Sequence, residues 1–438
     1  MALSHSVKQS SLIGHTLEVL ALALAGRRPA DTVVGEFFRA RHYLGSSDRR
    51  RIAESCYGVI RHHRLLAARA LRALGRPEGS PVDALLLVAV HEAVSSNDDA
   101  DVIASALGDR WQVAGMGSAD FVRAVRSCAA GEPAWPLAVR HSLPDFVAAE
   151  WARRFPPDEA EALCTASNAQ PPLAIRVNTL KGSVASCTAA LEKEGIAAAA
   201  GNFSPVALVL PRRINTASLR AFRDGLFEMQ DEGSQAIAPL LDVRPGMAVL
   251  DACAGGGGKS LHLAALMENR GEITALDVDR TRLDRLRLRA RRAGVSIVRS
   301  EVVRRGSTAL RAGRYDAVLV DAPCSGTGTF RRNPWAKLAC TEDASRSYAL
   351  RQRELLRRYG VAVRPGGKLV YSTCTLLEAE NRAVVEDFIA LRPEFTLCDA
   401  GGILTPLGVH AAAGGPWLEL LPHRTGTDGY FAAVMVRS

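Results

Sequence analysis

The feature that most constrains the fold is an alternation of short apolar segments with helical patterns, which begins near residue 231 and runs past residue 370. Helical periodicity starts near Lys259 and again near Thr281, and an apolar segment follows each helix. Strands separated by helices imply a mostly parallel sheet with both faces covered. We therefore predict an α/β, doubly wound domain over residues 231–438. Its strands are expected at Ala248–Asp251, Ile273–Asp277, Val295–Val298, Ala317–Asp321 and Lys368–Tyr371.

Two other patterns precede this domain. Residues 1–130 read as helices throughout, and Gly131-Glu-Pro-Ala-Trp-Pro136 then interrupts the helical pattern, so residues 131–144 are predicted to form a linker. A small α/β subdomain is predicted over residues 145–230. Its expected elements are a helix at Asp145–Arg154, a strand at Leu173–Leu180, a helix at Ser183–Glu194 and a strand at Val206–Leu210.

One helix of the N-terminal region is predicted to begin at Ser47 or Asp48, both of which are good N-cap residues. Its apolar side chains recur at spacings of four and three residues, which predicts a single buried stripe. The opposite face is rich in arginine, and it is either a solvated face or a face that contacts nucleic acid. The stripe consists of Ile52, Cys56, Val59, His63 and Leu66, and the arginines are Arg49, Arg50, Arg51, Arg61 and Arg64.

Composition narrows the class of protein. The chain has 55 Lys and Arg against 46 Asp and Glu, and this net charge of +9 favours a polyanionic partner such as nucleic acid. Nine cysteines occur without a CxxC pair, so neither a zinc knuckle nor a thioredoxin motif is expected, and no metal is predicted. The apolar run Leu12–Ala25 contains His15 and Glu18, so we expect neither a signal peptide nor a membrane span. A soluble cytoplasmic protein is the resulting expectation, and we also expect a monomer.

A glycine loop follows the first strand of the predicted sheet, at Val249–Ser260. A Walker A motif would need glycine where Cys253 stands, and a dinucleotide loop would need glycine at Ser260. The Asp-x-x-x-Gly-x-Gly loop of S-adenosylmethionine-dependent enzymes fits, with Asp251 as its acid. Asp277 ends the next strand, where such folds place the acid that binds ribose hydroxyls. The alternative is an ordinary tight turn beside a surface aspartate.

Two cysteines follow two other strands, in Asp321-Ala-Pro-Cys-Ser-Gly-Thr-Gly328 and in Tyr371-Ser-Thr-Cys-Thr375. A single cysteine at such a place is more often an inert buried residue. Two at equivalent strand ends, beside a methyl-donor loop, favour chemistry instead. A thiolate added at carbon 6 of cytosine would activate carbon 5 toward a methyl group, and a base would then remove the proton from carbon 5.

At these motifs the chain resembles the RsmB/Sun-type RNA (cytosine-5)-methyltransferases. The residues 1–130, with Asp48-Arg49 and Tyr57-Gly-Val-Ile-Arg61, are similar to the NusB-like RNA-binding domain of the RsmB branch. The resemblance implies a Rossmann-like methyltransferase domain, S-adenosylmethionine as cofactor and ribosomal RNA as partner. Further matching motifs are Arg176-Val-Asn-Thr-Leu-Lys181, Gln230-Asp-Glu-Gly-Ser-Gln235, Arg331-Arg-Asn-Pro334 and Asp428-Gly-Tyr-Phe431.

The resemblance also assigns roles. Cys374 would be the nucleophile, Cys324 would assist removal of the proton and release of the product, and Asp321 would contact the target base. Rival interpretations are a methyltransferase for tRNA or another RNA, an amino-group or DNA methyltransferase, and a catalytically silent RNA-binding factor. The expected cofactor-binding residues are Cys253, Ala254, Gly255, Gly256, Gly257, Gly258, Lys259, Asp277 and Asp321.

Three positions depart from the family pattern. Gly255-Gly-Gly-Gly-Lys259 replaces Ala-Pro-Gly-Gly-Lys, and Thr375 stands where serine is usual, which keeps a hydroxyl. The family also has an aspartate just after the third strand, toward the adenine of the cofactor. Here the stretch is Arg299–Arg304, so either Glu301 substitutes or the contact is absent.

Overall fold

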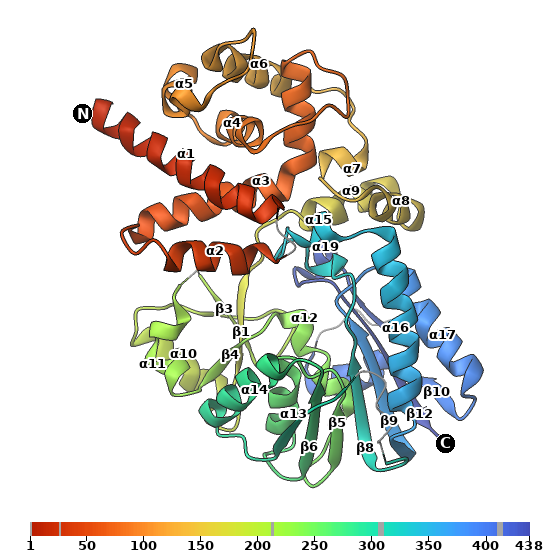
Figure 1. Ribbon diagram of the computed structural model, residues 1–438. Helices are drawn as coiled ribbons and strands as arrows, with labels where there is room; N and C mark the ends of the chain where they lie inside the picture. The colour runs from red at the N-terminus through yellow and green to blue at the C-terminus, as the bar shows by residue number, and fades with distance from the viewer. Residues whose placement is uncertain (1, 26–27, 212–213, 305–310, 410–414) are drawn as a thin grey trace. The chain divides into compact units, whose positions relative to one another are not determined.

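The computed structural model describes residues 2–25, 28–211, 214–304, 311–409 and 415–438. The chain forms two compact units (Figure 1), one made of residues 1–168 and 333–339 and the other of residues 169–332 and 340–438. The boundaries of these two units differ from the domain limits predicted at residues 130, 144 and 230. Those domain limits remain a prediction. In the described ranges, no helix combines the length and apolarity needed to cross a membrane.

The first unit is helical, as predicted. Side chains from several helices share one apolar core, which includes Leu20, Ile60, Val88 and Phe121. The helices are α1 (Ala2–Ala25), α2 (Ala30–Arg39), α3 (Ser46–Ala73), α4 (Ala84–Ser95), α5 (Ala100–Leu107), α6 (Ser118–Ala130), α7 (Leu137–Arg140), α8 (Asp145–Arg154), α9 (Pro157–Ala166) and α15 (Ala336–Ala339).

Helix α3 carries the predicted apolar stripe, and Ile52, Cys56, Val59 and Leu66 are buried. The prediction of its N-cap was wrong, because the helix begins at Ser46 and its cap is Gly45, which offers no side-chain oxygen. Several arginines of its polar face contact protein groups of the same unit. Arg51 pairs with Glu92 at 3.0 Å, Arg64 pairs with Asp145 at 2.9 Å, and Arg61 donates to the Asn168 carbonyl at 3.1 Å.

The segment 333–339 belongs to the first unit although its neighbours in the chain belong to the second. The Trp335 indole donates to the Ala23 carbonyl, and the buried Lys337 ammonium donates to the carbonyls of Arg61 and His141. Burial lowers the pKa of Lys337 to about 7.

The second unit opens with a small antiparallel sheet in the order β2-β3-β1-β4. Its strands are β1 (Leu173–Val177), β2 (Ala199–Ala200), β3 (Ala207–Leu210) and β4 (Phe227–Met229). Helices α10 (Val184–Glu192) and α11 (Arg220–Arg223) accompany it, and Ile175, Leu191, Leu208 and Phe227 share its core.

The large sheet of this unit has the order β10-β12-β9-β8-β5-β6-β7, with β11 paired to β12. The strands from β7 to β9 are parallel, and β12 runs antiparallel to β9. The order reverses between β5 and β8, which is the switch point where open α/β sheets bind ligands. The strands are β5 (Ala248–Asp251), β6 (Glu272–Asp277), β7 (Val298–Val302), β8 (Tyr315–Asp321), β9 (Val363–Thr373), β10 (Phe395–Cys398), β11 (Trp417–Leu420) and β12 (Tyr430–Arg437).

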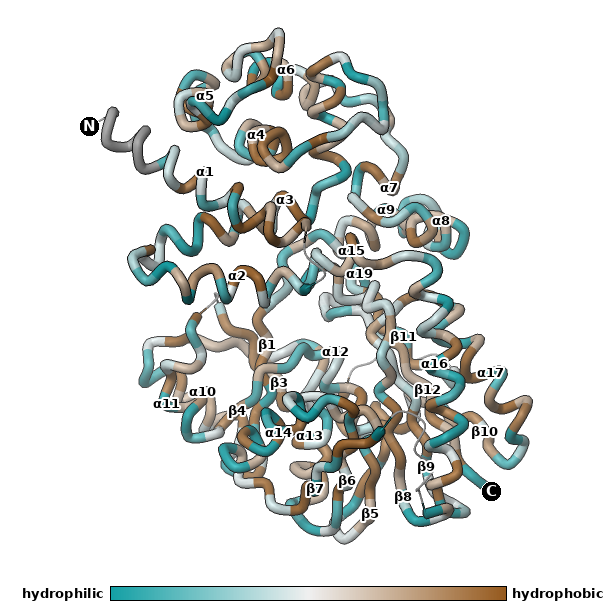
Figure 2. The backbone as a smooth tube through the Cα atoms, viewed as in Figure 1, coloured by the Kyte–Doolittle hydropathy of each residue, from teal (hydrophilic) through white to brown (hydrophobic). Residues whose placement is uncertain are grey.

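Both faces of the large sheet are covered, which confirms the doubly wound α/β prediction. Adjacent residues of β5 point to opposite faces, so Val249 joins the core with Leu263 of α13, and Leu250 joins the core with Leu356 of α16. Figure 2 shows these central strands in the hydrophobic colour. The helices are α12 (Glu232–Gln235), α13 (Gly258–Leu266), α14 (Arg280–Ala293), α16 (Glu342–Gly360), α17 (Arg382–Leu391), α18 (Ala400–Leu404) and α19 (Pro422–Thr425).

The third predicted strand, Val295–Val298, was wrong in its position. Gly294 ends α14 in the left-handed conformation, and the Val295 amide then bonds the Ala290 carbonyl, so these residues form the turn after the helix. Pairing with β6 begins only at Val298 and extends to Val302. Because β7 is an exposed edge strand, it lacks the apolar run that marks the other strands.

Candidate active site

The predicted site residues lie at one edge of the large sheet. Asp251, Asp277 and Asp321 are the last residues of β5, β6 and β8, and Cys374 follows β9 directly. Because these four strands are parallel, their carboxyl ends meet at the same edge.

The glycine loop joins β5 to α13 in a conformation that favours glycine. Gly255 and Gly257 have φ values of +54° and +82°. A Cβ at Gly257 would come within 2.5 Å of Leu286, so this glycine also permits close packing of α13 on α14. The Gly255 amide donates to the Asp277 carboxylate at 2.8 Å, and the Asp279 amide donates to its other oxygen. Asp277 therefore fixes the conformation of the loop.

Asp251 is 1% exposed and accepts a 2.6 Å hydrogen bond from the Ser260 hydroxyl through Oδ2. Its Oδ1 atom is buried and has no hydrogen-bond partner among the described residues. Burial is the largest cause that raises the pKa of Asp251 to about 6.

Asp321 is held between two side chains. The Lys259 ammonium lies 2.6 Å from Oδ2, and the Ser372 hydroxyl donates to Oδ1 at 2.8 Å. Burial alone would lower the pKa of Lys259, but the charge and hydrogen bond of Asp321, together with the neighbouring Cys374 and Asp251, raise that pKa above its ordinary value. The Lys259 ammonium therefore keeps its proton at neutral pH.

The two cysteines face each other, with 3.4 Å between the sulfur atoms of Cys324 and Cys374. The hydrogen bond with Cys374, and then burial, raise the pKa of Cys324 well above its usual range. Cys324 therefore holds its proton in this state.

Buried polar side chains fix the two cysteine loops. Glu380, which is fully buried, accepts from the Ser325 amide at 3.0 Å, from the Ser345 hydroxyl at 2.8 Å and from the Gln352 amide at 2.9 Å. The Thr375 hydroxyl lies 2.8 Å from that of Ser325, so this departure from the family pattern retains a contact between the loops. Sequence reasoning missed Glu380, because no local pattern distinguishes it from a surface carboxylate.

A cavity of about 720 Å³ opens at this edge. That volume lies in the range of small-molecule and cofactor sites. It is lined by Cys253, Ala254, Gly255, Gly256, Asp277, Asp321, Cys324 and Cys374, together with Val278, Arg282, Val303, Tyr348 and Tyr359 among others.

The residues suit S-adenosylmethionine. The unpartnered Asp251 Oδ1 offers an acceptor for the ammonium group of the cofactor, and Asp277 offers acceptors for ribose hydroxyls. Glu301 does not replace the missing aspartate, because it lies within β7 as an exposed residue, and Val303 lines the cavity instead.

A smaller cavity of about 270 Å³ shares Cys253, Ala254 and Asp321 with the larger one. Gly258 and Lys259 line it, whereas Gly257 lines neither cavity and packs on Leu286. Its remaining lining residues include Gln230, Asp231, Asp251, Arg289, Arg332, Asp428 and Tyr430.

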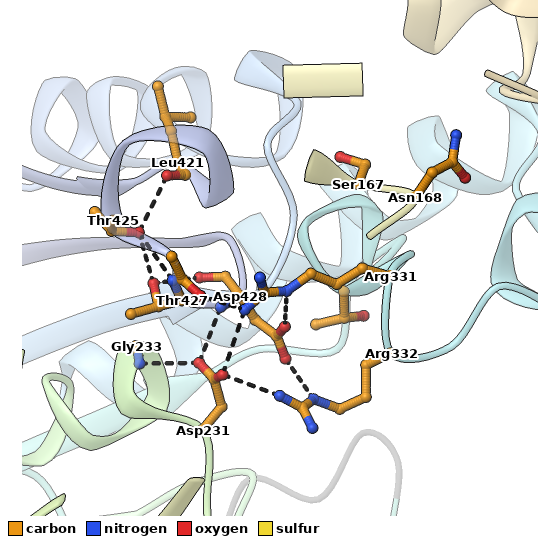
Figure 3. Close-up of polar contacts among 12 residues, drawn as sticks. Ser167, Asn168, Asp231, Gly233, Arg331, Arg332, Leu421, Thr425, Thr427 and Asp428 are labelled. Carbon is orange, nitrogen blue, oxygen red and sulfur yellow. Dashed lines mark hydrogen bonds and ion pairs between the residues drawn. The ribbon is translucent and has the colours of Figure 1, made fainter. Parts of the chain in front are cut away.

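Four charged residues at or next to the smaller cavity form one ion-pair cluster (Figure 3). Asp428 accepts from Nε of Arg331 and from Nε of Arg332, each at 2.6 Å, and Arg332 also reaches Asp231 at 3.0 Å. Burial, and then the neighbouring Asp428, raise the pKa of Asp231 to about 6. The cluster joins the motifs that begin at Gln230, Arg331 and Asp428, for which the sequence predicted no role.

A doubly wound sheet with this glycine loop, a strand-end aspartate and a cavity lined by both defines an S-adenosylmethionine-dependent methyltransferase. Residues 238–436 match the family model described as 16S rRNA methyltransferase RsmB/F, and residues 143–217 match the RsmF/B-like, ferredoxin-like domain. The chain belongs to the RsmB/F family of RNA methyltransferases.

Individual relatives agree with this assignment. The probable ribosomal RNA small subunit methyltransferase B of Bacillus subtilis is 35% identical over 69% of this chain and 68% of its own length. The ribosomal RNA small subunit methyltransferase B of Pseudomonas syringae is 31% identical over 89% of each chain. A methyltransferase homologue from Pyrococcus horikoshii is similar in structure, with 28% identity, a TM-score of 0.59, and coverage of 69% of this chain and 98% of its own.

Proposed function

We propose that the protein transfers a methyl group from S-adenosylmethionine to carbon 5 of a cytosine in ribosomal RNA of the small subunit, through a covalent bond between Cys374 and the base. The observation that carries the proposal is the pair of thiols 3.4 Å apart beside the cofactor cavity. Transfer to an amino group would need no thiol, and a silent RNA-binding factor would need neither thiol nor cofactor loop.

The first step belongs to Cys374. Its thiolate adds to carbon 6 of the cytosine, so a C–S bond forms and electron density moves onto the ring. Carbon 5 becomes nucleophilic, as covalent catalysis of this kind requires. The side chain of Asp321, paired with Lys259, would accept a hydrogen bond from the amino edge of the base and orient it.

The bound cofactor would supply the methyl group that carbon 5 takes. Carbon 5 then still carries its proton, and Cys324 is placed to remove it. The largest cause that raises the pKa of Cys324 is its hydrogen bond with Cys374. That cause disappears once the Cys374 sulfur is bonded to carbon, which lowers the pKa of Cys324 although burial still raises it. Cys324 would then release its own proton to solvent and act as the base. Loss of the carbon-5 proton restores the ring double bond, breaks the C–S bond and returns Cys374 as a thiolate.

Carbon 6 is accessible only when the base leaves its stack, so the substrate is expected to be single-stranded or bulged RNA. The small-subunit ribosomal RNA is proposed because the relatives carry that substrate in their names. A tRNA or another RNA is the alternative.

The test separates the two thiols. Cys374→Ala should abolish formation of 5-methylcytidine in small-subunit ribosomal RNA, measured by nucleoside mass spectrometry. Cys324→Ala should transfer the methyl group but retain the RNA, giving a protein–RNA band that survives denaturation and is lost in the double variant. Cys398→Ala, a half-buried cysteine outside both cavities, is the matched control and should behave as the unaltered protein.

The outcomes distinguish the alternatives. A trapped band with Cys374→Ala and none with Cys324→Ala would reverse the two roles. Full activity in both variants, or a methylated amino group in place of 5-methylcytidine, would refute the covalent mechanism. Methylation of tRNA but not of ribosomal RNA would refute only the substrate.

A further inference from the structure

Helix α14 carries an unusual charge for its length. Seven of its 14 residues are arginine, and Asp284 is its only acid. The buried side of the helix consists of Leu283, Leu286, Ala290 and Ala293. Figure 2 shows the remainder of the helix mostly in the hydrophilic colour.

The arginines divide into two groups by helical geometry. Residues spaced by three and four positions lie on one side of a helix. Arg282, Arg285, Arg289 and Arg292 therefore form one stripe that flanks the buried side. Arg280, Arg287 and Arg291 lie on another side of the helix.

Two arginines of this stripe lie at the two cavities. Arg282 lines the larger cavity and Arg289 lines the smaller one. At 1.5 Å per residue, they are separated by roughly 10 Å along the helix axis. Arg285 is midway between them and lines neither cavity.

The charges along the stripe differ in how far they are neutralised. Arg289 is paired with the buried Glu228 at 3.0 Å and donates to the Gly256 carbonyl at 2.6 Å. Arg282 lies 3.6 Å from Asp279. Arg285 is exposed and has no ion pair among the described residues, so it presents a full positive charge.

We propose that the stripe on α14 centred on Arg285 binds the phosphates of the RNA strand next to the target nucleotide. The proposal rests on the proposed function, because it takes RNA as the substrate. The target base must enter at the edge where the cavities open, so its flanking backbone has to pass over the elements that line them. A guanidinium recognises phosphate oxygens in bidentate geometry and stays charged at every physiological pH. Cofactor binding does not explain Arg285, since it lies outside the larger cavity.

The experiment compares two variants of the full-length protein that lose the same charge from the same helix. Arg285→Gln removes the stripe arginine, and Arg291→Gln removes an exposed arginine from the other side of α14. The dissociation constant for a fragment of small-subunit ribosomal RNA is measured from about 50 to 200 mM salt. Arg285→Gln should weaken binding roughly 3- to 10-fold at low salt and reduce the slope of log K against log salt by about 0.7, the value for one phosphate contact on a single strand.

The control should leave the slope unchanged, and neither variant should alter the affinity for S-adenosylmethionine. Equal losses in both variants would indicate only the long-range field of the helix and would overturn the proposal, as would no loss in either. A loss of cofactor affinity in Arg285→Gln would also overturn it. Formation of 5-methylcytidine by the unaltered protein on the same RNA is measured separately, so failure of the proposed reaction is distinguished from failure of this surface.

Discussion

Replacing Asp251 with asparagine is expected to stabilise the protein, and only above a defined pH. Burial raises the pKa of this carboxyl to about 6 in the folded protein. In an unfolded chain the pKa of aspartate is about 3.9. Between these values the folded state holds a proton that the unfolded state has lost. Stability therefore falls as pH rises through this window, and the cost is complete above it.

The magnitude follows from the two pKa values. A difference of one pKa unit corresponds to 1.36 kcal/mol, so ionising Asp251 costs the folded state about 3 kcal/mol at pH 8. Asparagine has nearly the same shape, can accept from the Ser260 hydroxyl and cannot ionise. The variant should therefore gain about 3 kcal/mol at pH 8 and little at pH 4. For a unit of this size the gain corresponds to a rise of roughly 6–12 °C in Tm.

Thermal unfolding at several pH values between 4 and 8 measures the effect, with Asp224→Asn as the control. Asp224 is an exposed carboxylate that pairs with Arg220 at 3.4 Å on the surface, so its loss should change Tm little at either pH. An Asp251→Asn variant whose Tm difference is the same at pH 4 and pH 8 would refute the reasoning. So would a variant that is less stable at pH 8.

Three further predictions concern the site. Asp277→Ala should weaken S-adenosylmethionine binding by roughly 1–3 kcal/mol, because it removes a charged acceptor from the cavity, and unchanged affinity in calorimetric titration would remove Asp277 from the site. Arg176→Lys should weaken cofactor binding more than RNA binding, because the buried guanidinium donates to the Gly258 carbonyl at 2.7 Å and lysine cannot keep its planar contacts; equal effects on both ligands would contradict this. Glu380→Ala should lower kcat while leaving cofactor affinity intact, because it removes the acceptor of the Ser325 amide, the Ser345 hydroxyl and the Gln352 amide; a normal kcat would show that the cysteine loop does not depend on this carboxylate.

Local patterns in the sequence are sufficient for much of the fold. The apolar strands and the helices between them predict a parallel sheet, because a chain of that pattern can bury both faces only in this way. Chain direction then brings the ends of β5, β6, β8 and β9 to one edge, so the convergence of Asp251, Asp277, Asp321 and Cys374 could be predicted without coordinates. The position of the edge strand β7 could not be predicted in this way, because an exposed strand has no apolar run.

The sequence by itself determined where β5, β6 and β8 end and where the glycine loop lies, because backbone periodicity and glycine conformation act over only a few residues. Contacts between distant parts of the chain were decided only by the tertiary structure. The 3.4 Å between Cys324 and Cys374 joins residues 50 positions apart. The bonds to Glu380 and from Arg176 to the cofactor loop depend likewise on packing between elements far apart in the chain. Such contacts form only when the elements pack against one another. Local sequence patterns do not determine the register of that packing.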